Sequence, residues 1–290
     1  MTALRAERYL DIAHFWRDAR AFLERDETGN TQVLAIAARH LEDPGTAPPA
    51  GYIVYADEEP VAAALLSPKG TLLVSPSTPS ELRVLRDSIA DNGPEVIDIS
   101  GERGTAERYA YLAGHAFRTH VVLQLYRLDQ VLPVGAVDGR MRQANDTDYE
   151  MLCAWQSEFM REAKVREGID DIAQSVTRRL RNGGAWLWEV DGMPVAHAAF
   201  RLTPIRSARI APVYTPAEHR GHGYAAALVA ALSRTLLEQG RAPLFLFADT
   251  TNPTANGVYR RVGFRPVGEH VHLTRDGTSG PEQSGQSGRQ

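Results

Sequence analysis

The sequence has little cysteine, no long apolar run and no large excess of one charge. Its 290 residues contain one cysteine, Cys153, which excludes an internal disulfide and a zinc site made of several thiolates. No apolar run approaches the roughly 20 residues of a membrane-spanning helix. The first ten residues carry Arg5, Glu7 and Arg8 and lack the apolar core of a signal peptide. We therefore expect a cytoplasmic protein with no membrane partner and no bound metal.

The charge balance argues against a nucleic-acid partner. Lys and Arg total 32 and Asp and Glu total 36, a net charge of -4, whereas nucleic-acid-binding proteins usually carry a basic patch or stripe. A small anionic ligand remains compatible with this balance, because a few local donors are enough to hold one. The apolar content of 43% is ordinary for a globular protein. The length favours two domains, since domains have about 100–200 residues.

The two halves of the chain repeat one order of predicted elements. Each has two helices, a β-hairpin, a strand, a helix, a buried strand, a closing helix and a final strand. The hairpin turn Asp191-Gly192 has a counterpart at Asp57. We predict an α/β fold of two tandem copies of one domain, each a central mixed β-sheet flanked by helices. A chance resemblance between two α/β halves is the alternative.

The predicted elements match between the halves in order more than in sequence. In the first half they are helices Tyr9–Arg25, Thr31–Leu41 and Glu81–Ala90, the hairpin Tyr52–Ala62, and strands Thr71–Val74 and Glu95–Ile99. In the second half they are helices Asp146–Ala163, Asp170–Arg181 and Gly223–Gln239, the hairpin Trp186–Ala196, and strands Ala208–Thr215 and Leu244–Ala248.

Breaks in these patterns predict the domain boundaries. Pro133, Gly135 and Gly139 interrupt the middle of the chain, so we expect a first domain at 1–130, a linker at 131–139 and a second domain at 140–274. The last residues, 275–290, are mostly Gly, Ser and Gln. Such a segment buries too little apolar surface to offset its ordering, and we expect a disordered tail.

The loop after the strand Ala208–Thr215 has the composition of a phosphate cradle. Gly221 and Gly223 let backbone N–H groups approach a bulky anion, and the following helix offers unpaired donors at its N-terminus. Arg220 adds a positive charge, and one of the two histidines, His219 or His222, is a candidate for a second. One alternative is an ordinary glycine-containing loop. Another is a dinucleotide fingerprint, which requires glycine closer to the strand end and an acidic residue about 20 residues on.

The same loop resembles the R/Q-x-x-G-x-G/A element of the GNAT superfamily of acetyl-CoA-dependent N-acetyltransferases. The resemblance implies that this loop binds the pyrophosphate of coenzyme A and that a bulged strand before it pairs with the pantetheine arm. Ala225 stands where glycine is the commoner residue, a mild departure. The resemblance assigns cofactor contacts to Val213, Tyr214, Thr215, Arg220, Gly221, His222, Gly223, Tyr224, Ala225 and Ala226.

A second motif about thirty residues downstream strengthens this resemblance. The residues Asn252, Ala255, Tyr259, Gly263 and Phe264 match the family element N-x-x-A-x-x-x-Y-x-x-x-G-F. By itself the segment is a well-punctuated short helix with an Asn cap and a Gly stop. The resemblance implies that Asn252 hydrogen-bonds the cofactor arm and that Tyr259 protonates the departing thiolate; a packing role for Tyr259 is the alternative.

The general base is less well defined by the sequence. Some family members carry a glutamate five residues before the asparagine, where this chain has Phe247. Asp249 lies two residues further on the same strand face, either as a base acting through water or as a cap of the following loop. Glu189 and His197 on the hairpin are further candidates, as are Glu158 and Glu162 as acceptor-pocket residues or as a solvated face. We expect Arg260 and Arg261 to be solvent-exposed charged residues on a helix.

The predicted function is transfer of an acetyl group from acetyl-CoA to a primary amine by direct attack, with the second domain catalytic. The acceptor is a small molecule or a peptide amine, and the protein is a monomer or homodimer. The first half has no glycine or arginine in its loop Ser75–Ser80, so we interpret it as a degenerate copy. A non-catalytic sensor or scaffold that binds CoA or acyl-CoA is the alternative function.

Overall fold

A computed structural model describes residues 3–42, 47–163, 169–203 and 205–277. The chain divides into two compact units: a first unit of Met1–Val122 with Glu269–Gln290, and a second unit of Leu123–Gly268. No helix among the described residues is long and apolar enough to cross a membrane. Beyond Gly277, the predicted tail lies outside the described residues.

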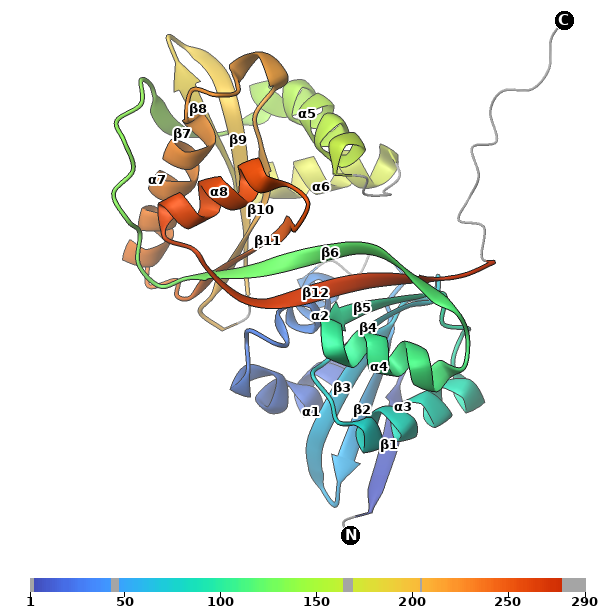
Figure 1. The fold of residues 1–290 in the computed structure, drawn as a ribbon. Helices are drawn as coiled ribbons and strands as arrows, with labels where there is room; N and C mark the ends of the chain where they lie inside the picture. The colour runs from blue at the N-terminus through green and yellow to red at the C-terminus, as the bar shows by residue number, and fades with distance from the viewer. Residues whose placement is uncertain (1–2, 43–46, 164–168, 204, 278–290) are drawn as a thin grey trace, which may run out of the picture. The chain divides into compact units, whose positions relative to one another are not determined.

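The first unit is a mixed sheet covered by four helices (Figure 1). Its strand order is β1-β2-β3-β4-β5-β12, in which only β4 and β5 are parallel. The strands are β1 (Leu4–Tyr9), β2 (Ala50–Ala56), β3 (Glu59–Leu66), β4 (Thr71–Val74), β5 (Asp98–Glu102) and the greater part of β12 (Arg265–Arg275). The helices are α1 (Ile12–Arg25), α2 (Thr31–Glu42), α3 (Pro79–Asn92) and α4 (Arg103–Ala113).

The second unit repeats this architecture. Its strand order is β6-β11-β10-β9-β8-β7, with β10 and β11 as the parallel pair. The strands are the second half of β6 (Phe117–Leu128), β7 (Arg140–Gln143), β8 (Ala185–Val190), β9 (Met193–Leu202), β10 (Ala208–Tyr214) and β11 (Leu244–Asp249). The helices are α5 (Tyr149–Glu162), α6 (Ile169–Arg181), α7 (Tyr224–Glu238) and α8 (Pro253–Val262), with short 3-10 turns at Asp146–Asp148 and Ala217–His219.

The final strand of each half completes the sheet of the other half. β6 follows α4, yet its Leu125 pairs with Phe247 of β11. β12 follows α8, yet its Val271 pairs with Gly101 of β5. The compact units therefore differ from the predicted boundaries 1–130 and 140–274, because a boundary placed along the chain cannot represent an exchange of strands.

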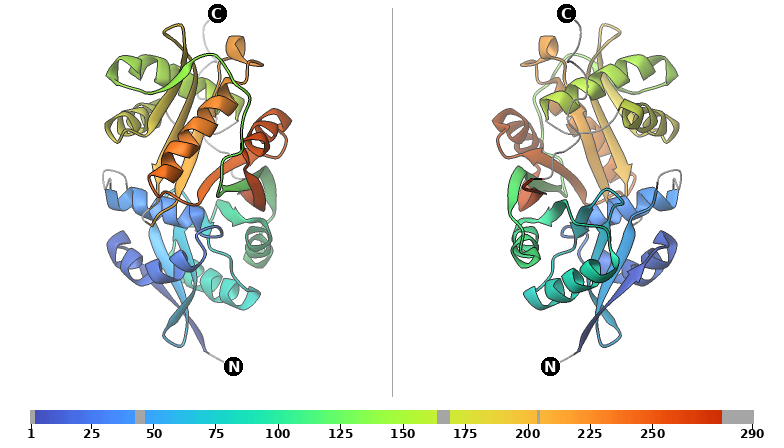
Figure 2. Two further views of the ribbon diagram at one scale, coloured as in Figure 1. Left: turned by 90° about the vertical axis from the view of Figure 1, so that its left-hand side faces the viewer. Right: turned by 90° about the vertical axis from the view of Figure 1, so that its right-hand side faces the viewer.

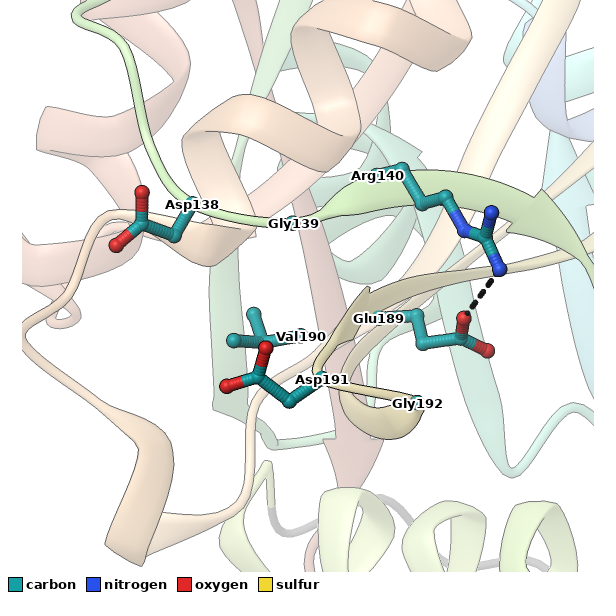
Figure 3. Close-up of a pocket in the computed structure, with 7 residues that line it drawn as sticks. All are labelled: Asp138, Gly139, Arg140, Glu189, Val190, Asp191 and Gly192. Atoms are coloured by element: carbon teal, nitrogen blue, oxygen red, sulfur yellow. Dashed lines mark hydrogen bonds and ion pairs between the residues drawn. The ribbon is translucent and has the colours of Figure 1, made fainter.

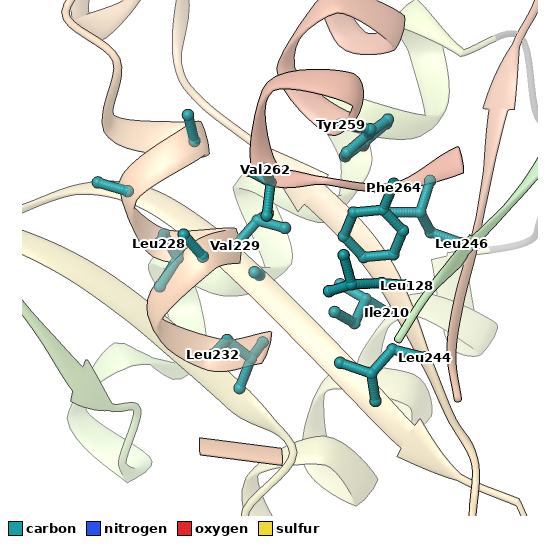
Figure 4. Packing of buried hydrophobic residues seen from close by; sticks show 14 of the residues in the cluster. Leu128, Ile210, Leu228, Val229, Leu232, Leu244, Leu246, Tyr259, Val262 and Phe264 are labelled. Carbon is teal, nitrogen blue, oxygen red and sulfur yellow. The ribbon is translucent and has the colours of Figure 1, made fainter. Parts of the chain in front are cut away.

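The core of the second unit lies between its sheet and the helices α7 and α8. Figure 2 shows α7 lying along the strands of this unit, and α7 packs against β8, β9 and β10. Leu228 and Leu232 of α7 meet Ile210, Leu244 and other side chains of this cluster, all nearly inaccessible to solvent (Figure 4). Leu244, Leu246 and Ala248 of β11, with Ala208 and Ile210 of β10, point into this core. The residues between them lie on the opposite face of the sheet, where α5 packs against β10.

The sequence predicted most elements within a few residues and missed two strands. The turn Asp191-Gly192 is confirmed, with φ of 49° and 80°. Tyr9, expected to begin a helix, ends β1, because Asp11 caps the helix by accepting a bond from the Ala13 N–H. The strand expected at Glu95–Ile99 begins three residues later. The missed strands β1 and β7 are edge strands in which charged residues alternate with few apolar ones, a weak signal.

Candidate functional site

The parallel strands β10 and β11 separate toward their carboxyl ends. They pair only at Ala208 with Leu244 and at Arg209 with Phe245. On its other side β10 pairs with β9 as far as Tyr214, with a bulge between Ile210 and Val213. The backbone of β10 beyond Arg209 thus has no ladder partner on the side of β11. A free strand edge of this kind accepts main-chain hydrogen bonds from an extended ligand.

The corresponding strands of the first unit stay together. There β4 pairs with β5 along its whole length, from Thr71 with Asp98 to Val74 with Gly101. The two units thus share a fold but differ at this point. In the part of the chain that the structure describes, an open strand edge lies between the parallel strands of the second unit and not between those of the first.

A loop with two left-handed glycines leads from β10 into α7. Gly221 and Gly223 have φ of 84° and 85°, a conformation that side-chain-bearing residues rarely adopt. Gly223 is the N-cap of α7, and no side chain caps this helix. The first helical bond runs from the Ala227 N–H to the Gly223 carbonyl, so the amides of Tyr224, Ala225 and Ala226 have no partner within the helix.

These amides form a site suited to phosphate groups. Free N–H groups at a helix start point outward, and the helix dipole is positive there. An added Cβ at Gly221 would meet no atom within 4 Å, so the loop lies open. Beside it, the Thr215 Oγ1 is buried without a hydrogen-bond partner among the described residues. An uncapped helix start and an orphaned hydroxyl fit the diphosphate and amide groups of a coenzyme A arm.

Arg220 holds the loop in place. Its guanidinium donates to both carboxylate oxygens of Glu162 at 2.8 Å and to the Thr215 carbonyl at 2.8 Å. Glu162 raises the pKa of Arg220. The charge of Arg220 is therefore already compensated, and the arginine fastens the loop to α5.

Two further predicted residues have local partners. The Tyr214 hydroxyl donates to Glu158 of α5 at 2.5 Å, and burial with this bond raises the Tyr214 pKa to about 12. His222 stacks on Tyr224 at 5.3 Å between ring centres. Glu158 and Glu162, considered in the sequence as pocket residues or a solvated face, instead connect α5 to β10 and to the loop.

Tyr259 of α8 lies in the core of the second unit. It is 7% exposed and its ring contacts those of Tyr126 and Phe264, each at 6.1 Å. Burial raises the pKa of its phenol well above the usual value, so the group is protonated at neutral pH. The hydroxyl makes no hydrogen bond to another described residue. Such a phenol is a proton donor held in an apolar setting.

Asn252 and Asn256 position the start of α8. The Asn252 side chain accepts from the Ala255 N–H at 3.0 Å, which confirms its role as a cap. The Asn256 amide donates to the carbonyls of Asp249 and Asn252 and accepts from the Tyr126 hydroxyl at 2.8 Å. Asn256 was not predicted from the sequence as a residue of this site. Its spacing from Asn252 and Tyr259 places it on α8, but nothing local indicates its partner on β6.

Asp249 forms the turn after β11. Its Oδ1 accepts from the Thr251 N–H and the Thr251 hydroxyl, both at 2.7 Å. Of the two roles considered for it, capping of the loop is present in the structure. Two residues earlier, Phe247 lies under the guanidinium of Arg209.

The other candidate bases are engaged elsewhere. Glu189 pairs with Arg142 at 2.6 Å and with Arg140 at 3.0 Å, and Arg142 lowers its pKa. His197 is buried, and burial together with Arg179 lowers its pKa to about 4. A pocket at the β8–β9 turn, formed by residues 138–140 and 189–192, contains the Arg140–Glu189 ion pair (Figure 3). None of the predicted cofactor contacts lines that pocket. Among the described residues, no cluster of three His, Cys, Asp or Glu side chains suits a metal ion.

In the first unit, side chains cap the N-terminus of α3, the helix that follows β4. Thr78 and Glu81 form a capping box on α3, with Pro79 at its first turn. The Thr78 hydroxyl thus accepts from a first-turn amide of α3, whereas no side chain does so at the start of α7. Tyr109 of α4, the counterpart of Tyr259 in the seventh position of its helix, is likewise buried, at 1% exposed. The capped start of α3 and the full pairing of β4 with β5 support the interpretation of the first half as a degenerate copy.

Comparison with known proteins agrees with this geometry. Residues 149–264 match the model of the acetyltransferase (GNAT) family. No curated protein sequence matches the chain significantly. A GNAT-family acetyltransferase from Colwellia psychrerythraea has a TM-score of 0.65 at 11% identity, over 93% of this chain and 99% of that chain.

Two other solved structures are similar over nearly the whole chain. A GCN5-related N-acetyltransferase from Sphaerobacter thermophilus has a TM-score of 0.60 at 17% identity, over 93% of this chain and 96% of its own. A tandem GNAT protein from the clavulanic acid biosynthesis pathway has a TM-score of 0.56 at 14% identity, over 95% of this chain and 100% of its own. At such identities these likenesses show the fold, which is that of a tandem protein.

Proposed function

We propose, from the premise that residues 149–264 form a domain of the acetyltransferase (GNAT) family, that the second unit transfers an acetyl group from acetyl-CoA to a primary amine. The family uses acetyl-CoA, and the chain accordingly carries an acyltransferase domain. The amine acceptor, a small molecule or a peptide, and the assignment of catalysis to the second unit are our proposals. We keep the expectation of a monomer or homodimer that acts without nucleic acid or membrane.

One contrast between the units carries this proposal. In the second unit β10 and β11 separate after Arg209 and α7 begins without a side-chain cap. In the first unit β4 and β5 remain paired and α3 is capped by the Thr78 side chain in a capping box with Glu81. An extended cofactor ending in a diphosphate needs both a free strand edge and free helix amides. Among the described residues, the second unit offers both at the ends of its parallel strands, and the first does not.

Acetyl-CoA supplies an activated thioester when bound. The free edge of β10 from Pro212 to Tyr214 orients its arm, and the amides after Gly221 hold its phosphates. A backbone N–H at the Val213 bulge donates to the oxygen on which negative charge develops during attack. The Tyr259 hydroxyl, protonated because its phenol is buried, gives its proton to the leaving sulfur.

The amine must lose a proton before or during attack. Asp249 remains our candidate for this step through a water, although one of its oxygens already holds the turn at Thr251. The Glu158 carboxylate of α5, which accepts from the Tyr214 hydroxyl at the end of β10, is a second candidate proton acceptor. A Glu158→Gln variant compared with Asp249→Asn separates the two assignments.

Substitution of Tyr259 tests the proposal directly. We expect Tyr259→Phe to reduce CoA release with amine acceptors about 100-fold or more, as is usual when a positioned acid is removed, while CoA still binds. The matched control is Tyr126→Phe, which removes the neighbouring hydroxyl that bonds to Asn256. Full turnover by Tyr259→Phe would reject the acid assignment. CoA binding without turnover by the wild-type protein, over a broad amine panel, would favour the sensor or scaffold alternative.

A further inference from the structure

Two arginines face each other in the second unit. Arg201 of β9 and Arg209 of β10 are directly opposite in the antiparallel ladder. Ala208 and Ile210 point into the core under α7, so Arg209 points to the other face of the sheet. Like charges at opposite positions of a sheet are unfavourable. A nearby anion would offset the repulsion between these two guanidinium groups.

Arg209 has no anionic partner among the described residues. Its Nε is buried and makes no hydrogen bond. Burial and the nearby Arg201 lower the Arg209 pKa to about 10, with no acidic side chain acting in the other direction. A guanidinium in this position is costly unless an anion accompanies it.

A third arginine, Arg127, lies in the same cross-strand row of the sheet as Arg209 but has a carboxylate partner. Arg127 of β6 lies opposite Phe245, which in turn lies opposite Arg209. The Arg127 guanidinium is paired with Asp129 at 2.8 Å, and Arg265 also reaches Asp129 at 3.0 Å. Among the residues that the structure describes, a carboxylate thus accompanies Arg127 but not Arg209.

Arg209 also lies at the place where the strands begin to separate. It is the last residue of β10 that pairs with β11. Its guanidinium lies 4.7 Å from the centre of the Phe247 ring, which covers one of its faces, and the hydrogen bonds of a guanidinium lie in its plane. A planar carboxylate matches that edge with two parallel bonds.

We propose that Arg209 binds a carboxylate of the acceptor, with Phe247 as the adjoining apolar wall, so that the substrate class is carboxylate-bearing primary amines. This proposal rests on the proposed acetyl transfer. It accounts for Phe247 at a position where the family resemblance places a glutamate, since a glutamate there would occupy the anion's place beside Arg209. The arginine acts as a specificity determinant and takes no part in proton transfer.

A binding experiment on the full chain tests the site without turnover. Thermal unfolding is measured with valerate, with inorganic phosphate and without ligand, for the wild type, Arg209→Met and the control Arg127→Met. We expect valerate to raise the Tm of the wild type and of Arg127→Met but not of Arg209→Met. Without ligand, Arg209→Met should be at least as stable as the wild type, because the buried unpaired charge is gone. A lower Tm of Arg209→Met without ligand, or an undiminished valerate shift, would overturn the proposal. A shift with phosphate and none with valerate, lost in Arg209→Met, would overturn the carboxylate assignment, whereas a phosphate shift that Arg209→Met retains belongs to the amides of α7.

A kinetic experiment links the site to the acceptor. CoA release is measured with ω-amino acids and with their neutral amides. We expect the wild type to prefer the acids, and Arg209→Met to raise KM for the acids at least 10-fold while its KM for the amides stays within 2-fold. Equal rates of the wild type on acids and amides would reject the carboxylate site and leave acetyl transfer intact. Absence of CoA release with every amine, together with a valerate shift lost in Arg209→Met, would reject acetyl transfer and leave the anion site supported.

Discussion

Two buried ionisable side chains of the second unit have different surroundings, and we assign them different roles. Tyr259 and His197 are both buried ionisable groups, but their surroundings differ. Tyr259 sits among aromatic rings with no hydrogen-bond partner among the described residues, whereas the His197 Nδ1 contacts the Trp186 carbonyl at 3.1 Å. The first has a proton to give, and the second is held neutral for packing.

His197 predicts a stability loss on acidification. Its folded pKa of about 4 lies below the unfolded value near 6.5. The unfolded chain therefore binds the proton first, and stability falls as pH drops from about 6.5 to about 4. Over that range we expect a loss of about 3 kcal/mol in the free energy of unfolding. Urea titrations at several pH values measure it. The His197→Gln variant should lack this slope; an unchanged slope would contradict the assignment.

Asn256 predicts a larger stability loss than its small size suggests. It joins β11, α8 and β6 through three hydrogen bonds. We expect Asn256→Ala to reduce the free energy of unfolding by about 2–4 kcal/mol, because the Tyr126 hydroxyl and two carbonyls lose a buried partner. A cycle with Tyr126→Phe isolates the side-chain pair, and strictly additive losses would show that the pair contributes nothing.

At the scale of elements, the two ends of α7 provide a matched comparison. Gly221 before the helix and Gly240 after it have φ of 84° and 76°, and an added Cβ at either meets no atom within 4 Å. Alanine at either position should therefore cost similar backbone strain, about 1–2 kcal/mol. Only Gly221 belongs to the loop whose amides we assign to phosphate.

We therefore expect Gly221→Ala to weaken CoA binding about 10-fold and Gly240→Ala to leave it unchanged. Isothermal titration with CoA measures both affinities, and urea unfolding verifies that the two variants lose comparable stability. Equal affinities for CoA would place the phosphates elsewhere.

On the scale of the whole molecule, the exchange of final strands decides which pieces fold. Tyr126 and Leu128 of β6 belong to the core of the second unit, and Val271 and Leu273 of β12 to that of the first. A fragment 140–274 lacks β6, so its β11 has no antiparallel neighbour from its own unit. We expect this fragment to show no cooperative thermal transition, since three buried side chains of β6 (Leu125, Tyr126 and Leu128) and the bond to Asn256 are missing. A cooperative transition with CoA affinity equal to that of the full chain would mean that β12 replaces β6 in the fragment.

The two motifs to which we assign cofactor binding could be recognised in the sequence because they are local. An uncapped helix start with Gly221 and Gly223, and an Asn252 cap seven residues before Tyr259, occupy single continuous segments. Helix periodicity, caps and tight turns involve only a few consecutive residues. The spacing of these residues along the chain therefore fixes their arrangement in space. The repeated order of elements, and with it the tandem fold, was predictable for the same reason.

The sequence alone therefore determined the elements, the tandem repetition and the two motifs that resemble the GNAT family. Only the tertiary structure decided that β10 and β11 separate, that Glu162 neutralises Arg220, that each final strand completes the other unit, and that Arg209 has no carboxylate beside it among the described residues. Each of these depends on residues far apart in the chain. Such pairings follow from how whole elements pack, and no local pattern encodes them.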